Sequence, residues 1–170
     1  MRKFIVVRGH AGSGKTTFAK EKIKEFKNEY TQAQIYHLEN DMFLTDEAGV
    51  YTWSPKLLED AKRKVAREIK QAYKFALENK AKDVLIVLSN VSARTKELLS
   101  LKEQAAQNGF IFECFRMQNF FASEHGVDED TVIAMFIKVA NNKIEGEILI
   151  PPVKPISQSV AQKIKDAAAL

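Results

Sequence analysis

The chain has few of the residues that build disulfide or metal scaffolds. Its one cysteine, Cys114, cannot form an internal disulfide, and its apolar neighbours predict a small buried core residue. No spacing of histidine, cysteine and aspartate is typical of a zinc site. No apolar run approaches the roughly 20 residues of a membrane span, and no signal peptide precedes the first apolar segment. We therefore expect a cytoplasmic protein that does not bind a membrane.

The composition excludes a largely disordered chain. Of the 170 residues, 45% are hydrophobic and 28% are charged, which is the balance of an ordinary globular protein of one domain. The formal net charge is +4, and many of the lysines fall on expected helices. Such lysines suit either a solvated surface or a nucleic-acid partner, and charge alone does not decide between the two.

One stretch, from Gly9 to Thr16, matches the P-loop pattern G-x-x-x-x-G-K-[ST] at every fixed position. It lies between an apolar run at 4–7 and a stretch with helical character, where backbone N–H groups and a helix dipole can hold phosphate. Lys15 would reach the β and γ phosphates, and the Thr16 hydroxyl would ligate Mg²⁺. The expected ligands are ATP, or alternatively GTP, and Mg²⁺. The predicted nucleotide-binding residues are Gly9, His10, Ala11, Gly12, Ser13, Gly14, Lys15, Thr16 and Thr17.

Apolar strands alternate with helical stretches along the whole chain. This alternation predicts an α/β three-layer sandwich with a mainly parallel sheet, and the apolar run 83–88 is expected at its centre. Residues 1–150 should form this domain, and residues 151–170 a proline-containing tail with a short helix. The expected strands are 3–8, 34–38, 83–88, 110–115 and 147–151, and the expected helices are 15–28, 55–80, 95–107 and 129–141.

Polar residues follow the second expected strand, at Glu39-Asn40-Asp41. Ligands of open α/β sheets bind at the carboxyl ends of the strands, so this cluster should face the P-loop. A carboxylate there is suited to orient or deprotonate a hydroxyl acceptor, and Asp41 is the candidate base, with Glu39 a weaker one. The chain is small for a motor and lacks the Asn-Lys-x-Asp motif of GTP switches. These features favour a small kinase.

Four further motifs accompany the P-loop in a recognisable order. They are Leu38-Glu39-Asn40-Asp41-Met42-Phe43, Gly49-Val50-Tyr51-Thr52-Trp53-Ser54-Pro55, Val87-Leu88-Ser89-Asn90-Val91-Ser92 and Glu124-His125-Gly126-Val127-Asp128. Over roughly residues 3–140 the chain resembles the small AAA-type P-loop kinases related to 5′-hydroxyl polynucleotide kinases, many of them encoded by phages. Zeta-toxin-like kinases are more distant relatives. The resemblance implies an adenylate-kinase-like architecture, with a lid at about residues 120–128.

The resemblance also implies roles for matching residues. Asp41 falls on the general base of the family, and Lys15 and Thr16 keep their phosphate and magnesium roles. Ser89 and Asn90 would lie beside the P-loop, near Mg²⁺ or the acceptor. Two histidines are expected to be structural: His10 contributes mainly its backbone N–H, and His125 shapes the lid turn.

Three family positions differ in this chain. The arginine expected three residues after the base is Leu44, residues 119–124 contain no lid arginine, and Ser89 stands where an acidic residue would close a strand. Substitute cations are Arg8, Arg94, Arg116 and Lys138. Among these, Arg116 is the catalytic candidate, expected at the end of the fourth strand near the lid, and Arg94 is an acceptor-side candidate. Tyr51 and Trp53 either stack an acceptor base or pack their loop onto the sheet.

The expected function is transfer of a γ-phosphate from ATP to a hydroxyl, on the 5′ end of DNA or RNA or on a nucleotide or modified base. A small-metabolite kinase is one alternative, because Leu44 removes a cation from the acceptor side. The other is a nucleotide-binding module with weak NTPase activity and a partner-binding role, which the missing lid arginine and strand-end acid favour.

Overall fold

The computed structural model describes residues 1–123 and 125–169. Two positions of the sequence predictions, Glu124 of the lid motif and Leu170 at the end of the tail, lie outside the described residues.

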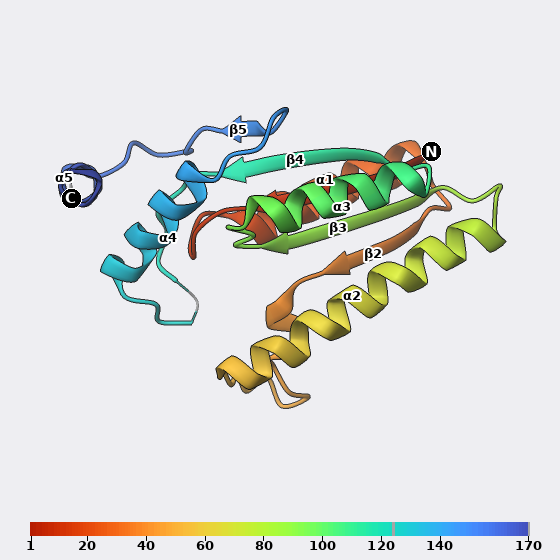
Figure 1. Cartoon of the computed structure of the whole chain (residues 1–170), viewed down its shortest axis with the longest axis horizontal. Coiled ribbons are helices and arrows are strands. Elements are labelled where there is room, and N and C mark those ends of the chain that lie inside the picture. The colour runs from red at the N-terminus through yellow and green to blue at the C-terminus, as the bar shows by residue number, and fades with distance from the viewer. Residues whose placement is uncertain (124, 170) are drawn as a thin grey trace.

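A five-stranded parallel sheet, in the order β2-β3-β1-β4-β5, forms the middle layer, which confirms the predicted α/β sandwich. All arrows of the sheet point the same way in Figure 1. The central strand is β1, so the apolar strand β3, predicted at the centre, lies one place away beside it. The strands are β1 (Arg2–Arg8), β2 (Gln34–Leu38), β3 (Val84–Asn90), β4 (Ile111–Met117) and β5 (Ile148–Ile150).

Helices cover both faces of the sheet (Figure 1). A short 3₁₀ turn, η1 (Asn40–Phe43), follows β2. Ser54 caps α2, because its hydroxyl accepts a hydrogen bond from the Leu57 N–H, and proline occupies the first turn. The helices are α1 (Lys15–Glu29), α2 (Pro55–Glu78), α3 (Thr95–Gln107), α4 (Glu129–Asn141) and α5 (Gln158–Ala168).

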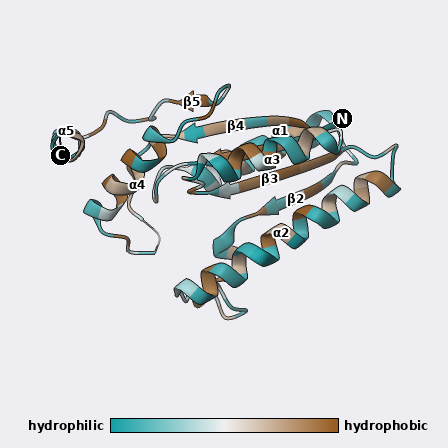
Figure 2. Ribbon diagram, in the orientation of Figure 1, coloured by the Kyte–Doolittle hydropathy of each residue, from teal (hydrophilic) through white to brown (hydrophobic). Residues whose placement is uncertain are grey.

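Alternate residues of the central strands build two hydrophobic cores. Phe4 and Val6 of β1 face one way and pack with α2 and α3, whereas Ile5 and Val7 face the other way and pack with α1. Figure 2 shows the hydrophobic colouring along β3, whose residues are buried almost throughout. Cys114 is buried and free, and burial raises the pKa of its thiol to about 12, as expected for an inert core residue.

Two strands run further than predicted, and both extensions carry polar residues. β3 was expected to end at residue 88 and continues to Asn90, while β4 was expected to end at 115 and continues to Met117. The reason is the central strand: Arg8 of β1 pairs with Asn90 on one side and with Arg116 on the other. Backbone pairing does not depend on the side chain, so the ladder continues past the apolar residues.

The tail forms the expected helix, α5, which lies against α4 (Figure 1). Lys163 of α5 pairs with Glu129 at 3.2 Å and with Asp130 at 3.6 Å. Both carboxylates belong to the first turn of α4, where negative charge is also favoured by the helix dipole.

Candidate active site

The P-loop joins β1 to α1 at the carboxyl edge of the sheet. Gly12 and Gly14 have φ angles of 77° and 95°, and Gly14 caps α1 in the left-handed conformation. A Cβ on Gly12 would lie 2.3 Å from the carbonyl oxygen of Phe121, so glycine is required there by space as well as by conformation. The loop therefore has the local shape that the motif predicts.

The Lys15 ammonium folds back over the P-loop. Its Nζ donates hydrogen bonds to the carbonyl oxygens of Gly9, at 3.0 Å, and His10, at 2.9 Å. Burial lowers the pKa of Lys15 to about 8, although the nearby carboxylates of Asp41 and Glu39 act in the opposite direction. Burial removes water from this ammonium group, and the nearby carboxylates offset that cost only in part. The group is therefore suited to bind a ligand with several negative charges.

Glu39 contacts the predicted magnesium ligand. The Thr16 hydroxyl donates to Glu39 Oε1 at 3.1 Å, and the same oxygen lies 3.1 Å from His37 Nε2. Burial acts to raise the pKa of Glu39, but the hydrogen bonds of His37 and Thr16 and the charges of His37 and Lys15 outweigh it, so the pKa is lowered. Glu39 is therefore held as an anion beside the Thr16 hydroxyl.

These oxygens suit Mg²⁺, which prefers hard oxygen ligands and keeps several waters. Ser89 follows the pair Leu38–Leu88 in the parallel register, which places it next to Glu39. Its hydroxyl is buried and has no hydrogen-bond partner among the described residues. The sequence lacks an acidic residue at this end of β3, and the structure supplies a carboxylate from the end of β2 instead.

Asp41 lies at the same edge of the sheet. It belongs to η1, whose first residue is tied to β3, because the Asn40 N–H donates to the Asn90 side-chain oxygen at 2.9 Å. Asp41 Oδ2 lies 3.4 Å from His125 Nε2, and its charge acts on Lys15. The predicted base and the predicted phosphate-binding lysine thus lie at the same edge of the sheet, and Asn90 ties the turn that carries Asp41 to the end of β3.

Arg116 is the penultimate residue of β4, close to the strand end where it was expected, and it is engaged by a buried carboxylate. Its Nε is 3.4 Å from Glu147 Oε1, while Arg8 Nη1 donates to Glu147 Oε2 at 2.8 Å. Glu147 is 5% exposed and Arg8 is fully buried. One buried carboxylate thus lies beside both arginines. The sequence contains no local signal for it, since Glu147 is distant in the chain.

The remaining acceptor-side candidates are dispersed. Arg94 precedes α3 with an exposed side chain and lies 3.5 Å from Glu97. Trp53 is 55% exposed, whereas Tyr51 stacks on His125. Tyr51 also lies close to Asp41, because burial and then the Asp41 charge raise the pKa of its hydroxyl.

The lid is attached to the P-loop by contacts that sequence reasoning missed. The Asn119 side chain donates to the Ser13 carbonyl at 2.8 Å, and the Phe121 N–H donates to the Gly12 carbonyl at 2.9 Å. His10 is buried, hydrogen-bonds to the Asn119 carbonyl and stacks on Phe120, with ring centroids 4.3 Å apart. Burial lowers its pKa to about 4, so the ring is neutral at pH 7. The His10 ring, expected to matter less than its backbone, is thus a packing element.

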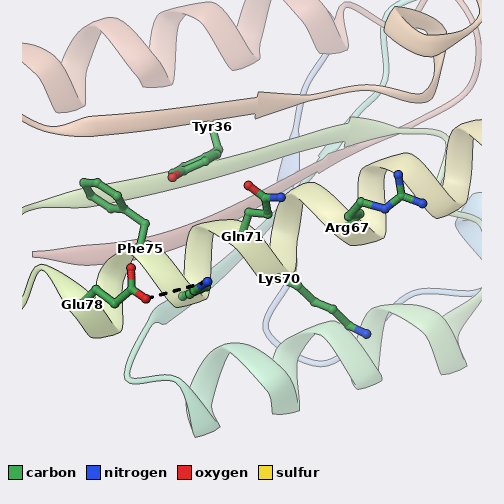
Figure 3. Close-up of a pocket in the computed structure, with 7 residues that line it drawn as sticks. Tyr36, Arg67, Lys70, Gln71, Phe75 and Glu78 are labelled. Carbon is green, nitrogen blue, oxygen red and sulfur yellow. Dashed lines mark ion pairs between the residues drawn. The ribbon is translucent and has the colours of Figure 1, made fainter.

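A hollow of about 410 Å³ lies between β2 and α2 (Figure 3). Of the residues that line the hollow, Tyr36 comes from β2 and the others from α2. None of them belongs to the P-loop or to the Glu39–Asp41 cluster. It is lined by Tyr36, Arg67, Lys70, Gln71, Lys74, Phe75 and Glu78. The candidate site is therefore the carboxyl edge of the sheet and not this hollow.

Two absences hold within residues 1–123 and 125–169. This part of the chain contains no group of three or more His, Cys, Asp or Glu side chains arranged to hold a metal ion. Among the helices described, none is both long and apolar enough to cross a membrane.

No protein-family model matches the chain. Its fold is similar to that of two proteins solved with a bound nucleotide. One is the APS kinase CysC of Mycobacterium tuberculosis with AMPPNP and APS, at 13% identity and a TM-score of 0.50, covering 99% of this chain and 98% of that chain. The other is Chaetomium thermophilum Kti12 with ADP-AlF3, at 12% identity and a TM-score of 0.50, covering 98% and 97%.

A relative with much higher identity is known from sequence. The uncharacterized protein PM0531 of Pasteurella multocida (strain Pm70) is 38% identical over 169 residues, which cover 99% of this chain and 94% of the relative. The chain has the fold of P-loop kinases and belongs to the same family as PM0531.

Proposed function

We propose that this protein is an ATP- and Mg²⁺-dependent kinase that transfers the γ-phosphate to a hydroxyl, on a polynucleotide 5′ end or on a nucleotide or modified base. The observation that carries the proposal is the hydrogen bond from the Thr16 hydroxyl to Glu39, at 3.1 Å, which joins the P-loop residue next to Lys15 to the Glu39–Asp41 cluster at one edge of the sheet. The nucleotides named in the two solved structures of similar fold support a triphosphate ligand.

The residues of the P-loop would hold the donor. Backbone N–H groups of 9–17 would surround the phosphates, and the Lys15 ammonium would exchange its two carbonyl contacts for phosphate oxygens. The Thr16 hydroxyl would face the metal, with Glu39 fixing its orientation. Mg²⁺, when bound, neutralises charge that develops on the transferred phosphoryl group.

Asp41 would act on the acceptor. Its carboxylate accepts the proton of the acceptor hydroxyl as the hydroxyl oxygen forms a bond to the γ-phosphorus and the bond to the ADP oxygen breaks. Lys15 stabilises the charge on the phosphates during this step. The hydrogen bond from the Asn40 N–H to the Asn90 side chain holds the turn that carries Asp41 against the end of β3.

The test is transfer of labelled γ-phosphate from ATP to a panel of acceptors: 5′-hydroxyl oligodeoxynucleotides and oligoribonucleotides, nucleosides and small metabolites. We expect labelling of the oligonucleotides, with a KM that rises with salt concentration. If only the small metabolites were labelled, the acceptor would be a metabolite and not a polynucleotide or nucleotide. The engagement of Arg8 and Arg116 by Glu147 favours a second candidate, a nucleotide-binding module, which slow ATP hydrolysis without labelling of any acceptor would establish.

Glu39→Gln is expected to raise the Mg²⁺ concentration for half-maximal transfer by about tenfold. Glutamine can still accept the Thr16 hydrogen bond, so the change removes charge and not contact. The matched control is Glu113→Gln, because Glu113 is a half-buried partner of Lys3 in the middle of β4. An unchanged Mg²⁺ titration in Glu39→Gln would contradict the proposed role of Glu39.

A further inference from the structure

The lid segment contacts both halves of the site. At one end the Phe121 N–H is hydrogen-bonded to the Gly12 carbonyl of the P-loop, at 2.9 Å. Four residues later in the chain, His125 Nε2 lies 3.4 Å from Asp41 Oδ2. A single short segment therefore connects the phosphate-binding loop to the candidate base.

Tyr51 holds the His125 ring from a third segment. The two rings are stacked, with centroids 3.8 Å apart and planes inclined by 12°. Tyr51 forms an antiparallel bridge with Thr45, and the Thr45 hydroxyl donates to the Asp41 carbonyl oxygen at 2.9 Å. The hairpin that carries Tyr51 is thus anchored on the turn that carries Asp41.

The Asp41 side chain depends on these partners for its orientation. It projects from a single 3₁₀ turn, and it is 50% exposed. Within the described part of the chain, its close polar partners are His125 and the Tyr51 hydroxyl, whose pKa is raised by burial first and then by the charge and hydrogen bond of Asp41. A polar contact this exposed contributes little to folding stability, so its main consequence is the direction in which the carboxylate points.

We infer that His125 is a positioning residue, which holds the Asp41 carboxylate toward the acceptor hydroxyl while Tyr51 holds the imidazole. The inference rests on the proposed function and adds a residue to it. The same segment is hydrogen-bonded to the P-loop through Phe121, so His125 reaches Asp41 from a segment that also contacts the donor site.

His125→Ala should lower kcat for phosphorylation of a 5′-hydroxyl oligodeoxynucleotide by about 30- to 100-fold, the scale of a small misplacement of a reacting group. The KM for ATP should not change, because Lys15 and Thr16 are untouched. His125→Gln retains a side-chain donor and should recover part of the loss. The matched control is Glu129→Gln, because Glu129 is a neighbour on the lid side that pairs with Lys163 of α5 and not with Asp41.

A double-mutant cycle with Asp41→Asn separates positioning from an independent effect. If His125 acts through Asp41, His125→Ala causes no further loss in the Asp41→Asn background. The inference would be overturned, and the proposed function left standing, by either of two results. One is a double variant whose loss of kcat is the product of the two single losses, and the other is a His125→Ala protein with wild-type kcat. A wild-type protein that labels no acceptor would overturn both the proposed function and this inference. If His125→Ala fails to fold, His125→Gln takes its place in the cycle.

Discussion

Asp41→Asn is expected to lower the rate of phosphoryl transfer by about a thousandfold, within the range for loss of a positioned general base. Asparagine has nearly the shape of aspartate, so η1 and the contacts of its backbone should persist. Its amide cannot accept the proton of the acceptor hydroxyl, and it places no negative charge beside Lys15. The measurement is the single-turnover rate with labelled ATP, together with ATP affinity by calorimetry.

The contrast with Lys15→Ala makes this prediction specific. Lys15→Ala should weaken ATP binding and transfer together, because its ammonium contacts the P-loop where the phosphates bind. Asp41→Asn should leave ATP affinity close to that of the wild type. Asp130→Asn, a charge change at an exposed aspartate of α4, is the matched control and should change neither quantity. Transfer at the wild-type rate in Asp41→Asn would show that another group takes the proton.

The parts of the site that are local in sequence were predictable. The P-loop is one continuous motif, and its conformation follows from its glycines and from the strand and helix around it. The neighbourhood of Asp41 and the P-loop follows from a rule of parallel sheets, in which strand ends share one edge. Whether Asp41 acts as the base is a chemical question, and it stays a prediction.

Contacts between distant segments were not predictable, because they depend on side-chain packing that no local pattern encodes. Glu39 was considered only as a weak candidate base, yet it lies against the Thr16 hydroxyl. Arg116 lies near the end of β4, as expected, but its contact with Glu147 could not be foreseen. The Asn119 contact with the P-loop joins residues 106 positions apart.

The structure also explains one difference from the polynucleotide kinase pattern, at Leu44. Leu44, at the position where that family carries an arginine, is 6% exposed and lines a small hollow beneath the 43–57 loop. The position is therefore a packing position here, and a cation for an acceptor phosphate has to come from elsewhere.

Glu147→Gln is expected to destabilise the protein by about 3–5 kcal/mol, the cost of breaking a buried ion pair by removing one partner. Arg8 donates to Glu147 and to two backbone carbonyls, those of Ser92 and Asn142, and its second terminal nitrogen has no partner among the described residues. Arg8 and Arg116 would then share a site with no neutralising carboxylate. For a domain of this size the loss corresponds to a fall in Tm of roughly 10 °C.

Glu145→Gln provides the control, since Glu145 is exposed and lies two residues before Glu147 on the same turn. Equal stability of the two variants would show that the charge of Glu147 does not stabilise the protein through Arg8 and Arg116.

A third variant separates charge from packing. Replacing Arg8, Arg116 and Glu147 together by Met, Met and Leu removes all three charges while filling their space. Such apolar replacements of a buried cluster are often neutral or stabilising. We therefore expect the triple variant to be more stable than Glu147→Gln, because the penalty comes from uncompensated arginines and not from the loss of the glutamate itself.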